Sequence, residues 1–314
     1  MKEFLTIDKI SVEMLVILSI YILDLQNVVS HLKNMSYISK TLSSSLVKKY
    51  VMAITGFALA SFLLIHMLGN LQTFEGGPHA INAYAHTLQT LPWEVLWGFR
   101  IGLGLCFVIH FAMAYLLVLE NKKSRPQTYA VKKTLAASAA AKTMIYTGSL
   151  ILVFAVFHIL HYTVLALNPD FKILDWVCNA GMYEGKTLHD VYAMMILGFS
   201  NTWVSVAYLV ALFAIGFHLV HAVSSMFQSI GLRNETVRYN LNKIAAIYAV
   251  VIFGGFALNP LAALAGKYTP CQALPVKEVV KQYEAAKAAN KDPIFIDYSF
   301  LNKKCEKAPT SAAK

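Results

Sequence analysis

Charged residues are scarce in this chain. They make up 14% of its 314 residues, while hydrophobic residues make up 57%. Ordinary soluble domains carry about 25% charged residues, so this balance predicts a membrane protein. The formal charge of +10 would suit a nucleic-acid-binding protein. However, the basic residues lie between apolar segments and form no single patch, so a nucleic-acid partner is excluded.

Cysteine is also scarce, and its spacing excludes several metal centres. The four cysteines are Cys106, Cys178, Cys271 and Cys305, and no two of them form a C-x-x-C pair. A zinc site, an iron–sulfur site and a covalently attached haem are therefore unsupported. Cys271 and Cys305 could form a disulfide in an oxidising compartment, or they could be two unrelated thiols. The sequence leaves both interpretations open.

Five long apolar segments dominate the rest of the chain. They cover residues 50–71, 95–119, 143–167, 201–227 and 244–265. Each is long enough to cross about 30 Å of hydrocarbon at about 1.5 Å per residue. In lipid, a spanning segment must satisfy its backbone hydrogen bonds internally, so these segments must be helices. The sequence therefore predicts an all-α membrane protein built as a five-helix transmembrane bundle.

The N-terminal residues do not fit this pattern. The apolar stretch 14–23 is bracketed by Glu13 and Asp24 and falls well short of the about 20 residues that a span needs. It is an interfacial segment or an uncleaved signal-like stretch, and Met35 offers an alternative start. We therefore divide the chain into an N-terminal extension (1–45), a transmembrane domain (46–265) and a C-terminal tail (266–314).

Lysine and arginine are distributed unevenly among the connections. They precede the first span and gather between the second and third and between the fourth and fifth spans. Residues 72–99 contain none, and 168–190 contain two lysines against four acids. The positive-inside rule then predicts a cytoplasmic N-terminus for this multi-pass protein, which we expect in the bacterial cytoplasmic membrane. The tail would lie outside, and its lysines count mildly against this.

The connections predicted to lie outside contain two short helices. Gly76-Gly77-Pro78 indicates a turn, and the residues after it predict a helix on the membrane surface. Residues 276–289 form a helix candidate in the tail.

Histidines within the spans are the main candidates for function, because ionisable residues inside a membrane are rare and functional by default. The first four spans contain six of them: His66, His110, His158, His161, His218 and His221. These four spans contain no Asp or Glu, and the fifth contains no histidine. His158 and His161 form one doublet, and His218 and His221 form a second. His66 and the first doublet lie toward the predicted outer ends, and His110 and the second doublet lie toward the inner ends.

Histidines at two depths would suit two stacked b-type haems, because haem iron takes an axial imidazole from each face. Within each doublet the rings lie only about 4.5 Å apart along the axis, so neither doublet can serve both haems. Two alternatives remain. Each histidine could be a structural residue with a local hydrogen bond, or the set could form the relay of a proton-coupled transporter, although transporters more often carry intramembrane carboxylates and broken helices.

Several short motifs occur one after another in the spans and in the first connection. They are Lys48-Lys49 with Thr55-Gly56, His66-Met67-Leu68-Gly69-Asn70-Leu71, Asn82-Ala83-Tyr84-Ala85-His86 with Leu91-Pro92, His110 with Ala112 and Ala114-Tyr115, Phe157-His158-Ile159-Leu160-His161-Tyr162-Thr163, and Phe217-His218-Leu219-Val220-His221 leading into Ser225-Met226-Phe227-Gln228-Ser229-Ile230-Gly231. With them the chain resembles the cytochrome b subunit of succinate:quinone oxidoreductases, in the five-helix, two-haem class that also serves some fumarate reductases. The resemblance covers about residues 45–265.

The resemblance implies one axial ligand from each of the first four spans. His66 and His158 would bind the iron of the outer haem, and His110 and His218 that of the inner haem. The depths of the histidines give the same pairing, but the choice within each doublet rests on the resemblance alone. Some members have a glutamate two residues before the fourth ligand, proposed to carry protons. Gly216 stands there in this chain, which puts such a path in doubt.

The resemblance also implies partners and a substrate. A flavoprotein that interconverts succinate and fumarate and an iron–sulfur subunit would sit on the cytoplasmic side. Electrons would pass between the clusters, the two haems and a quinone, which in this class is most often menaquinone. The chain itself would have no catalytic residue for the dicarboxylate chemistry.

A quinone site would need groups near the outer haem that exchange protons. Glu75, His86 and Arg100 lie on the predicted outer side and are candidates. His86 could instead cap the surface helix, and Arg100 could pair with a haem propionate. Two further classes also stay open at this point: a di-haem subunit of another quinone-linked enzyme, such as a hydrogenase, formate dehydrogenase or nitrate reductase, and a structural anchor without haem.

Overall fold

The computed structural model describes residues 44–75, 77–124, 139–232, 234–266 and 276–299. The described residues are mostly helical (82%). It divides into two compact units, residues 1–51 and 52–314, and the boundary falls within the first described helix. Almost all of the predicted N-terminal extension lies outside the described residues. Cys271 and Cys305 lie outside them as well, so the disulfide stays a prediction.

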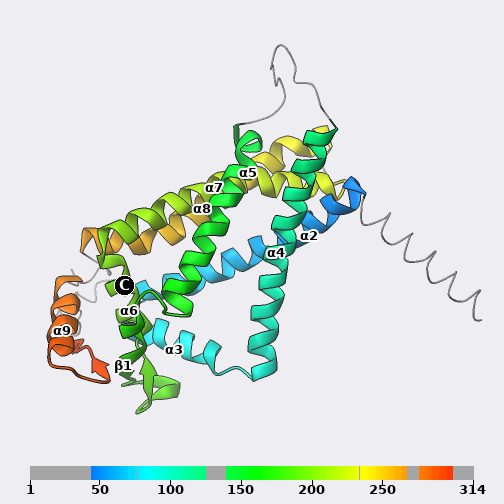
Figure 1. Ribbon diagram of the computed structural model, residues 1–314. Helices are drawn as coiled ribbons and strands as arrows, with labels where there is room; N and C mark the ends of the chain where they lie inside the picture. Colours follow the sequence, from blue (N-terminus) through cyan, green and yellow to red (C-terminus); the bar gives the residue numbers. More distant parts are fainter. Residues whose placement is uncertain (1–43, 76, 125–138, 233, 267–275, 300–314) are drawn as a thin grey trace, which may run out of the picture. The chain divides into compact units, whose positions relative to one another are not determined.

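Within the described residues, five helices are long and apolar enough to cross a membrane, in agreement with the five predicted spans. They are α2 (Ser45–Leu71), α4 (Trp93–Lys123), α5 (Ala139–His158) continued by the π-helix η2 (Ile159–Thr163), α7 (Thr202–Ser229) and α8 (Glu235–Ala265). Figure 1 shows these helices along the chain.

Two spans end or begin at positions that hydropathy alone does not predict. The third span stops at Thr163, four residues before the predicted end, although the next residues are apolar. There the backbone turns, and Leu165 has a φ of 57°, which no helix accommodates. The fifth span begins at Glu235, before the predicted residue 244. The Asn234 side chain caps it by accepting a hydrogen bond from the backbone N–H of Val237 at 2.9 Å.

The spans pack most closely around α7 and α8, which run side by side along their length (Figure 1). Their shared core contains Leu212, Ile215 and Ile252, together with Met67 from α2. The approach of α2 to α8 depends on Gly255, because a Cβ there would lie 2.2 Å from the Met67 sulfur.

The remaining elements connect the spans and follow the last one. They are η1 (Gln72–Phe74), α3 (Pro78–Gln89), η3 (Pro169–Ile173), β1 (Leu174–Val177), η4 (Gly181–Tyr183), β2 (Thr187–His189), α6 (Val191–Ser200), α9 (Val276–Ala288) and β3 (Ile294–Phe295). We call them together the cap region. The helices α3 and α9 confirm the two short helices predicted from sequence.

The cap region also contains elements that the sequence did not predict. A three-stranded sheet has the order β2-β1-β3, with β1 antiparallel to β2 and parallel to β3. Asp175 pairs with His189, and Leu174 pairs with Ile294. These strands have only two to four residues, too few for an alternating pattern to be visible in the sequence.

The cap region is built from three segments: the connection between α2 and α4, the connection between α5 and α7, and the tail. A common apolar core joins them. Leu174, Tyr192, Val279 and Ile294 are almost fully buried in it. These residues come from the connection between α5 and α7 and from the tail, and α3 from the first connection packs on α6. Spans that alternate in direction bring these three segments to one side, as predicted. Which side of a membrane this is stays a prediction.

Candidate functional site

Two pairs of histidines lie between the spans. His110 of α4 extends toward the beginning of α2, where its Nδ1 lies 3.0 Å from the carbonyl oxygen of Met52 and 3.3 Å from the Thr55 hydroxyl. A carbonyl oxygen can only accept a hydrogen bond, so Nδ1 carries the proton and donates it. The other ring nitrogen, Nε2, therefore keeps a lone pair.

His218 of α7 has the same arrangement against α5. Its Nδ1 lies 3.0 Å from the hydroxyl of Thr147, and that hydroxyl donates its only proton to the carbonyl oxygen of Thr143 at 3.1 Å. The Thr147 oxygen must then accept from the Nδ1–H of His218, and Nε2 again keeps its lone pair.

Glycine makes room for both rings. A Cβ at Gly56 would lie 3.0 Å from the Cε1 atom of His110, and a Cβ at Gly148 would lie 3.5 Å from that of His218. The two rings therefore rest on equivalent positions of α2 and α5. A side chain at either position, at Gly56 above all, would displace the ring.

The second pair consists of His66 of α2 and His158 of α5. Their ring centroids are 5.9 Å apart at an interplanar angle of 75°. The ring of Phe62 stacks on His66 at 5.3 Å, and Phe154 lies 5.9 Å from His158. The Nδ1 of His158 lies 3.1 Å from the hydroxyl of Tyr208.

The two pairs lie at different heights along α2 and α5. His66 follows Gly56 on α2 by ten residues, and His158 follows Gly148 on α5 by the same number. At about 1.5 Å per residue, each helix separates its two sites by roughly 15 Å. Four spans therefore contribute one histidine each, two at either height.

The structure also separates the members of the first doublet. His158 makes the ring contact with His66, whereas His161 lies in the π-helix, 2% exposed, with its Nδ1 3.1 Å from the same Tyr208 hydroxyl. Within the described residues, no ring contact joins His161 to His66. The choice of His158 over His161 as a ligand stays a prediction.

The donor set suits an ion that takes two imidazoles. Two nitrogens at about 2 Å on opposite sides of a metal would place the ring centroids roughly 6 Å apart, close to the spacing of His66 and His158. No cluster of three or more His, Cys, Asp or Glu side chains that could hold a metal occurs in the part of the chain that the structure describes. Haem iron needs only two protein ligands, because the macrocycle supplies the others.

The three predicted quinone residues are not brought together. Glu75 follows η1 and is exposed. His86 lies in α3 with its ring 4.8 Å from that of Tyr183, and the guanidinium of Arg100 lies 5.3 Å over the ring of Trp97. Across the described ranges, no hydrogen bond, ion pair or ring contact joins any two of the three.

The sequence reasoning missed a repeat. Thr-Gly, a phenylalanine and a histidine recur with the same spacing on α2 and α5: Thr55-Gly56, Phe62 and His66 on the first, and Thr147-Gly148, Phe154 and His158 on the second. This spacing was visible in the sequence and would have indicated the seats of His110 and His218 directly. Tyr208 had no such signal, because a lone tyrosine near a span end usually indicates an interfacial anchor.

A buried polar cluster in the cap region was also missed. Asp190 is fully buried and accepts hydrogen bonds from the Asn82 amide (3.0 Å), the Ala193 backbone (3.0 Å) and the Tyr298 hydroxyl (2.8 Å). Burial raises the pKa of the Asp190 carboxyl, and these hydrogen bonds oppose the rise. Burial also raises the pKa of Tyr298, and Asp190 adds to the effect. The cluster ties α3, α6 and the tail together.

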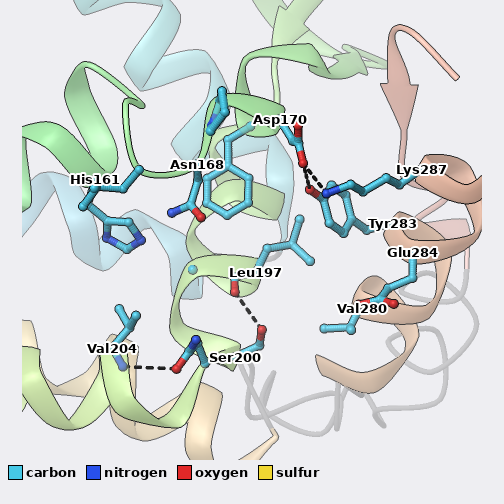
Figure 2. Close-up of a pocket in the computed structure, with 15 residues that line it drawn as sticks. His161, Asn168, Asp170, Leu197, Ser200, Val204, Val280, Tyr283, Glu284 and Lys287 are labelled. Carbon is cyan, nitrogen blue, oxygen red and sulfur yellow. Dashed lines mark hydrogen bonds and ion pairs between the residues drawn. The ribbon is translucent and has the colours of Figure 1, made fainter. Parts of the chain in front are cut away.

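Beside His161 lies a cavity of about 330 Å³, which Figure 2 shows between the end of the third span and α9. No sequence motif indicated it, because its walls come from three segments far apart in the chain.

Comparisons with protein-family models, curated proteins and solved structures find no match to this chain. The resemblance to the cytochrome b subunit therefore rests on the sequence motifs.

Proposed function

We propose that this chain is a di-haem cytochrome b subunit that anchors an enzyme complex in the membrane and passes electrons between that complex and a quinone. The motifs favour a succinate dehydrogenase or fumarate reductase complex. The partners would then be a flavoprotein and an iron–sulfur subunit on the cytoplasmic side, and the quinone would be menaquinone.

The observation that carries the proposal is the repeated seat on α2 and α5. Each helix offers a threonine and a glycine to a histidine from another span, and ten residues later offers a histidine of its own. A structural histidine needs one hydrogen-bond partner and no such repetition. Four histidines, two at each height, match the ligand requirement of two b-type haems.

Haem at these positions would supply two centres that each accept and release one electron. The residues of this chain would hold and orient the groups. His66 and His158 would bind iron at one height, and His110 and His218 at the other. Thr55, Thr147 and Tyr208 accept or share the Nδ1 protons of His110, His218 and His158, which fixes the orientation of these rings and leaves their Nε2 atoms to bind iron. The Nε2 of His66 lies 3.4 Å from the Asn70 amide, a contact that iron binding would replace.

The apolar side chains around the pairs would exclude water. Phe62 and Phe256 both lie against the ring of His66, at 5.3 Å and 5.5 Å between centroids. A low-dielectric, water-poor surrounding tunes the redox potential of a metal centre.

A haem assay tests the proposal. The chain is purified in detergent, and its absorption spectrum and pyridine haemochrome are recorded. Two b-type haems per polypeptide are expected. A chain without a Soret band would overturn the proposal and leave a structural anchor or a histidine-relay transporter.

A second measurement identifies the complex. The chain is purified with its bound partners from its native membrane. A flavoprotein with succinate- or fumarate-linked activity is expected. Copurification of a hydrogenase, formate dehydrogenase or nitrate reductase would instead assign the chain to another quinone-linked enzyme.

A further inference from the structure

The cavity beside His161 is large enough to hold a small molecule. Its volume of about 330 Å³ falls in the range of small-molecule pockets, about 300–1,000 Å³. The end of the third span, the junction of α6 and α7 and the helix α9 form its walls (Figure 2). Two of these walls belong to span ends, so a ligand could reach the cavity from the membrane.

His161 presents an unused nitrogen to this cavity. The residue is 2% exposed, and its Nδ1 is committed to the Tyr208 hydroxyl. Among the residues that the structure describes, no group forms a hydrogen bond with its Nε2. This nitrogen is therefore available to form a hydrogen bond with a ligand in the cavity.

The single proton of Tyr208 determines what His161 offers. The Tyr208 hydroxyl lies 3.1 Å from the Nδ1 of His158 and 3.1 Å from the Nδ1 of His161. When His158 binds iron through Nε2, its own proton sits on Nδ1 and is donated to the Tyr208 oxygen. Tyr208 must then donate to His161, whose proton consequently sits on Nε2. The cavity receives an N–H donor.

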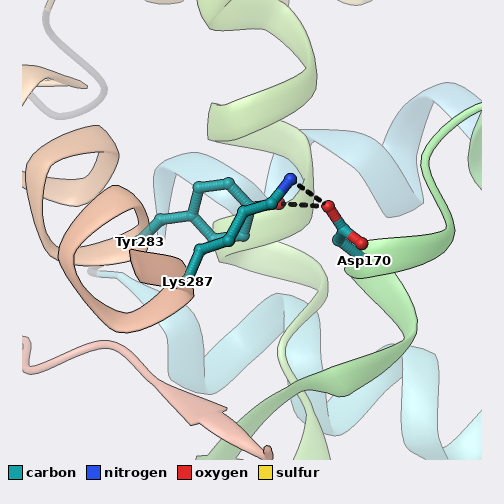
Figure 3. Close-up of polar contacts among 3 residues, drawn as sticks. All are labelled: Asp170, Tyr283 and Lys287. Atoms are coloured by element: carbon teal, nitrogen blue, oxygen red, sulfur yellow. Dashed lines mark hydrogen bonds and ion pairs between the residues drawn. The ribbon is translucent and has the colours of Figure 1, made fainter. Parts of the chain in front are cut away.

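The opposite wall is fixed by a polar contact. Lys287 and Tyr283 of α9 both bind the carboxylate of Asp170 (Figure 3). The hydrogen bond to Asp170 raises the pKa of Lys287, and burial raises that of Tyr283, so both keep their protons. Asp170 neutralises the lysine, and the nearby carboxylate of Glu284 disfavours an anion. The rest of the lining combines apolar side chains, such as those of Leu197 and Val280, with the uncharged polar side chains of Asn168, Ser200 and Asn201. The cavity therefore suits a neutral ligand with a hydrogen-bond acceptor.

We propose that this cavity binds the head group of the quinone, with one carbonyl oxygen accepting a hydrogen bond from the Nε2–H of His161. The proposal rests on the proposed function, because ligation by His158 sets the protonation of His161. It replaces Glu75, His86 and Arg100 as the quinone site. It also places the quinone one hydroxyl group away from a ligand of the outer haem.

Quinone binding to the purified full-length chain tests this site. The probe is a 1,4-naphthoquinone with one isoprenoid unit, and its Kd is measured by quenching of tryptophan fluorescence. His161→Leu should raise the Kd about three- to tenfold, the expected effect of losing one hydrogen bond. The control is His79→Leu, a histidine of the cap region whose Nε2 bonds to the Ala180 carbonyl at 2.6 Å. It should leave the Kd unchanged.

A second pair of variants tests the cavity without touching the histidines. Val280→Trp fills the cavity from α9 and should abolish detectable binding. Lys281→Trp, on the exposed face of the same helix, should have no effect. Unchanged binding in both His161→Leu and Val280→Trp would overturn the proposal. So would weaker binding in His86→Leu with none in His161→Leu, which would place the quinone at α3.

Haem content separates this test from the test of function. Two haems in all variants, with the Kd raised only by His161→Leu and Val280→Trp, would support both proposals. Two haems with an unchanged Kd would overturn the quinone site alone. A wild-type chain without haem would overturn the function and, with it, the protonation argument for the site. Loss of haem in His161→Leu would identify His161 as a ligand and overturn the site.

Discussion

The spans and the cap region bury polar groups in different ways. In the spans, a threonine, a tyrosine or a backbone carbonyl holds the Nδ1 of His110, His158 and His218, and Nε2 of these rings is left for a ligand. The Nε2 of His66 lies 3.4 Å from the side-chain amide of Asn70. In the cap region, the Asp190 carboxylate accepts three hydrogen bonds. The polar groups of the spans are therefore arranged to bind something, whereas those of the cap region hold its segments together.

The largest expected effect breaks one site in the spans. His218→Ala should remove the inner haem and leave the outer one, because no other nitrogen is held on Thr147 and Gly148. His221→Ala should leave both haems. Optical spectra and haem-to-protein ratios of the purified variants provide the measurement. Two normal haems in His218→Ala would contradict the pairing of His110 with His218.

A change in the cap region should act on stability and leave the haems in place. Asp190→Ala leaves three buried donors without their acceptor, which should lower the stability of the cap region by about 3 kcal/mol or more. The measurement is the protease concentration needed to cleave the cap region, with haem content measured in parallel. Cleavage at wild-type protease concentrations would contradict the structural role of the cluster.

A smaller change tests the support of a ligand. Thr147→Val removes the acceptor for the Nδ1–H of His218 but keeps the shape of the side chain. We expect haem affinity at this site to fall about 10- to 100-fold, the usual cost of losing such a partner. Transfer of haem to apomyoglobin reports the loss. The matched control is Thr143→Val, whose hydroxyl bonds only to its own helix, and it should behave as wild type.

The smallest expected effect is a pH dependence confined to the cap region. Because burial raises the pKa of Asp190, the folded chain keeps this proton to a higher pH than the unfolded chain does. The stability of the cap region should therefore fall as pH rises from about 4, the pKa of an unfolded aspartate, through the raised value. Hydrogen exchange of cap amides across this range measures it. Asp190→Asn should lack the decline, and an identical decline in that variant would rule Asp190 out.

The same contrast explains what the sequence could predict. The spans were predictable because lipid forces long apolar segments into helices, whatever their neighbours. Their ends were less so, since Asn234 and Leu165 act through local backbone geometry. The sheet of the cap region could not be predicted, because strands of two to four residues depend on partners distant in the chain.

The positions of the histidines along the spans could be read from the sequence, but the hydrogen-bond partners of their rings could not. Counting residues from the span ends placed His66 with His158 and His110 with His218. The partners of the rings required the structure, although the repeat of Thr55-Gly56 in Thr147-Gly148 was available in the sequence. The role of Tyr208 could not be inferred, because it depends on two rings from another span meeting one hydroxyl.

The π-helix at the end of the third span has a consequence for how this chain can vary. Residues 159–163 hold one more residue per turn than an α-helix would, and His161 sits among them. Deleting one residue before His161 would restore the regular helix and keep the hydropathy of the span. It would also change the position of the imidazole around the helix axis relative to Tyr208. A deletion of one residue could therefore remove the link from His158 to the cavity and still leave a span that anchors the chain in a membrane.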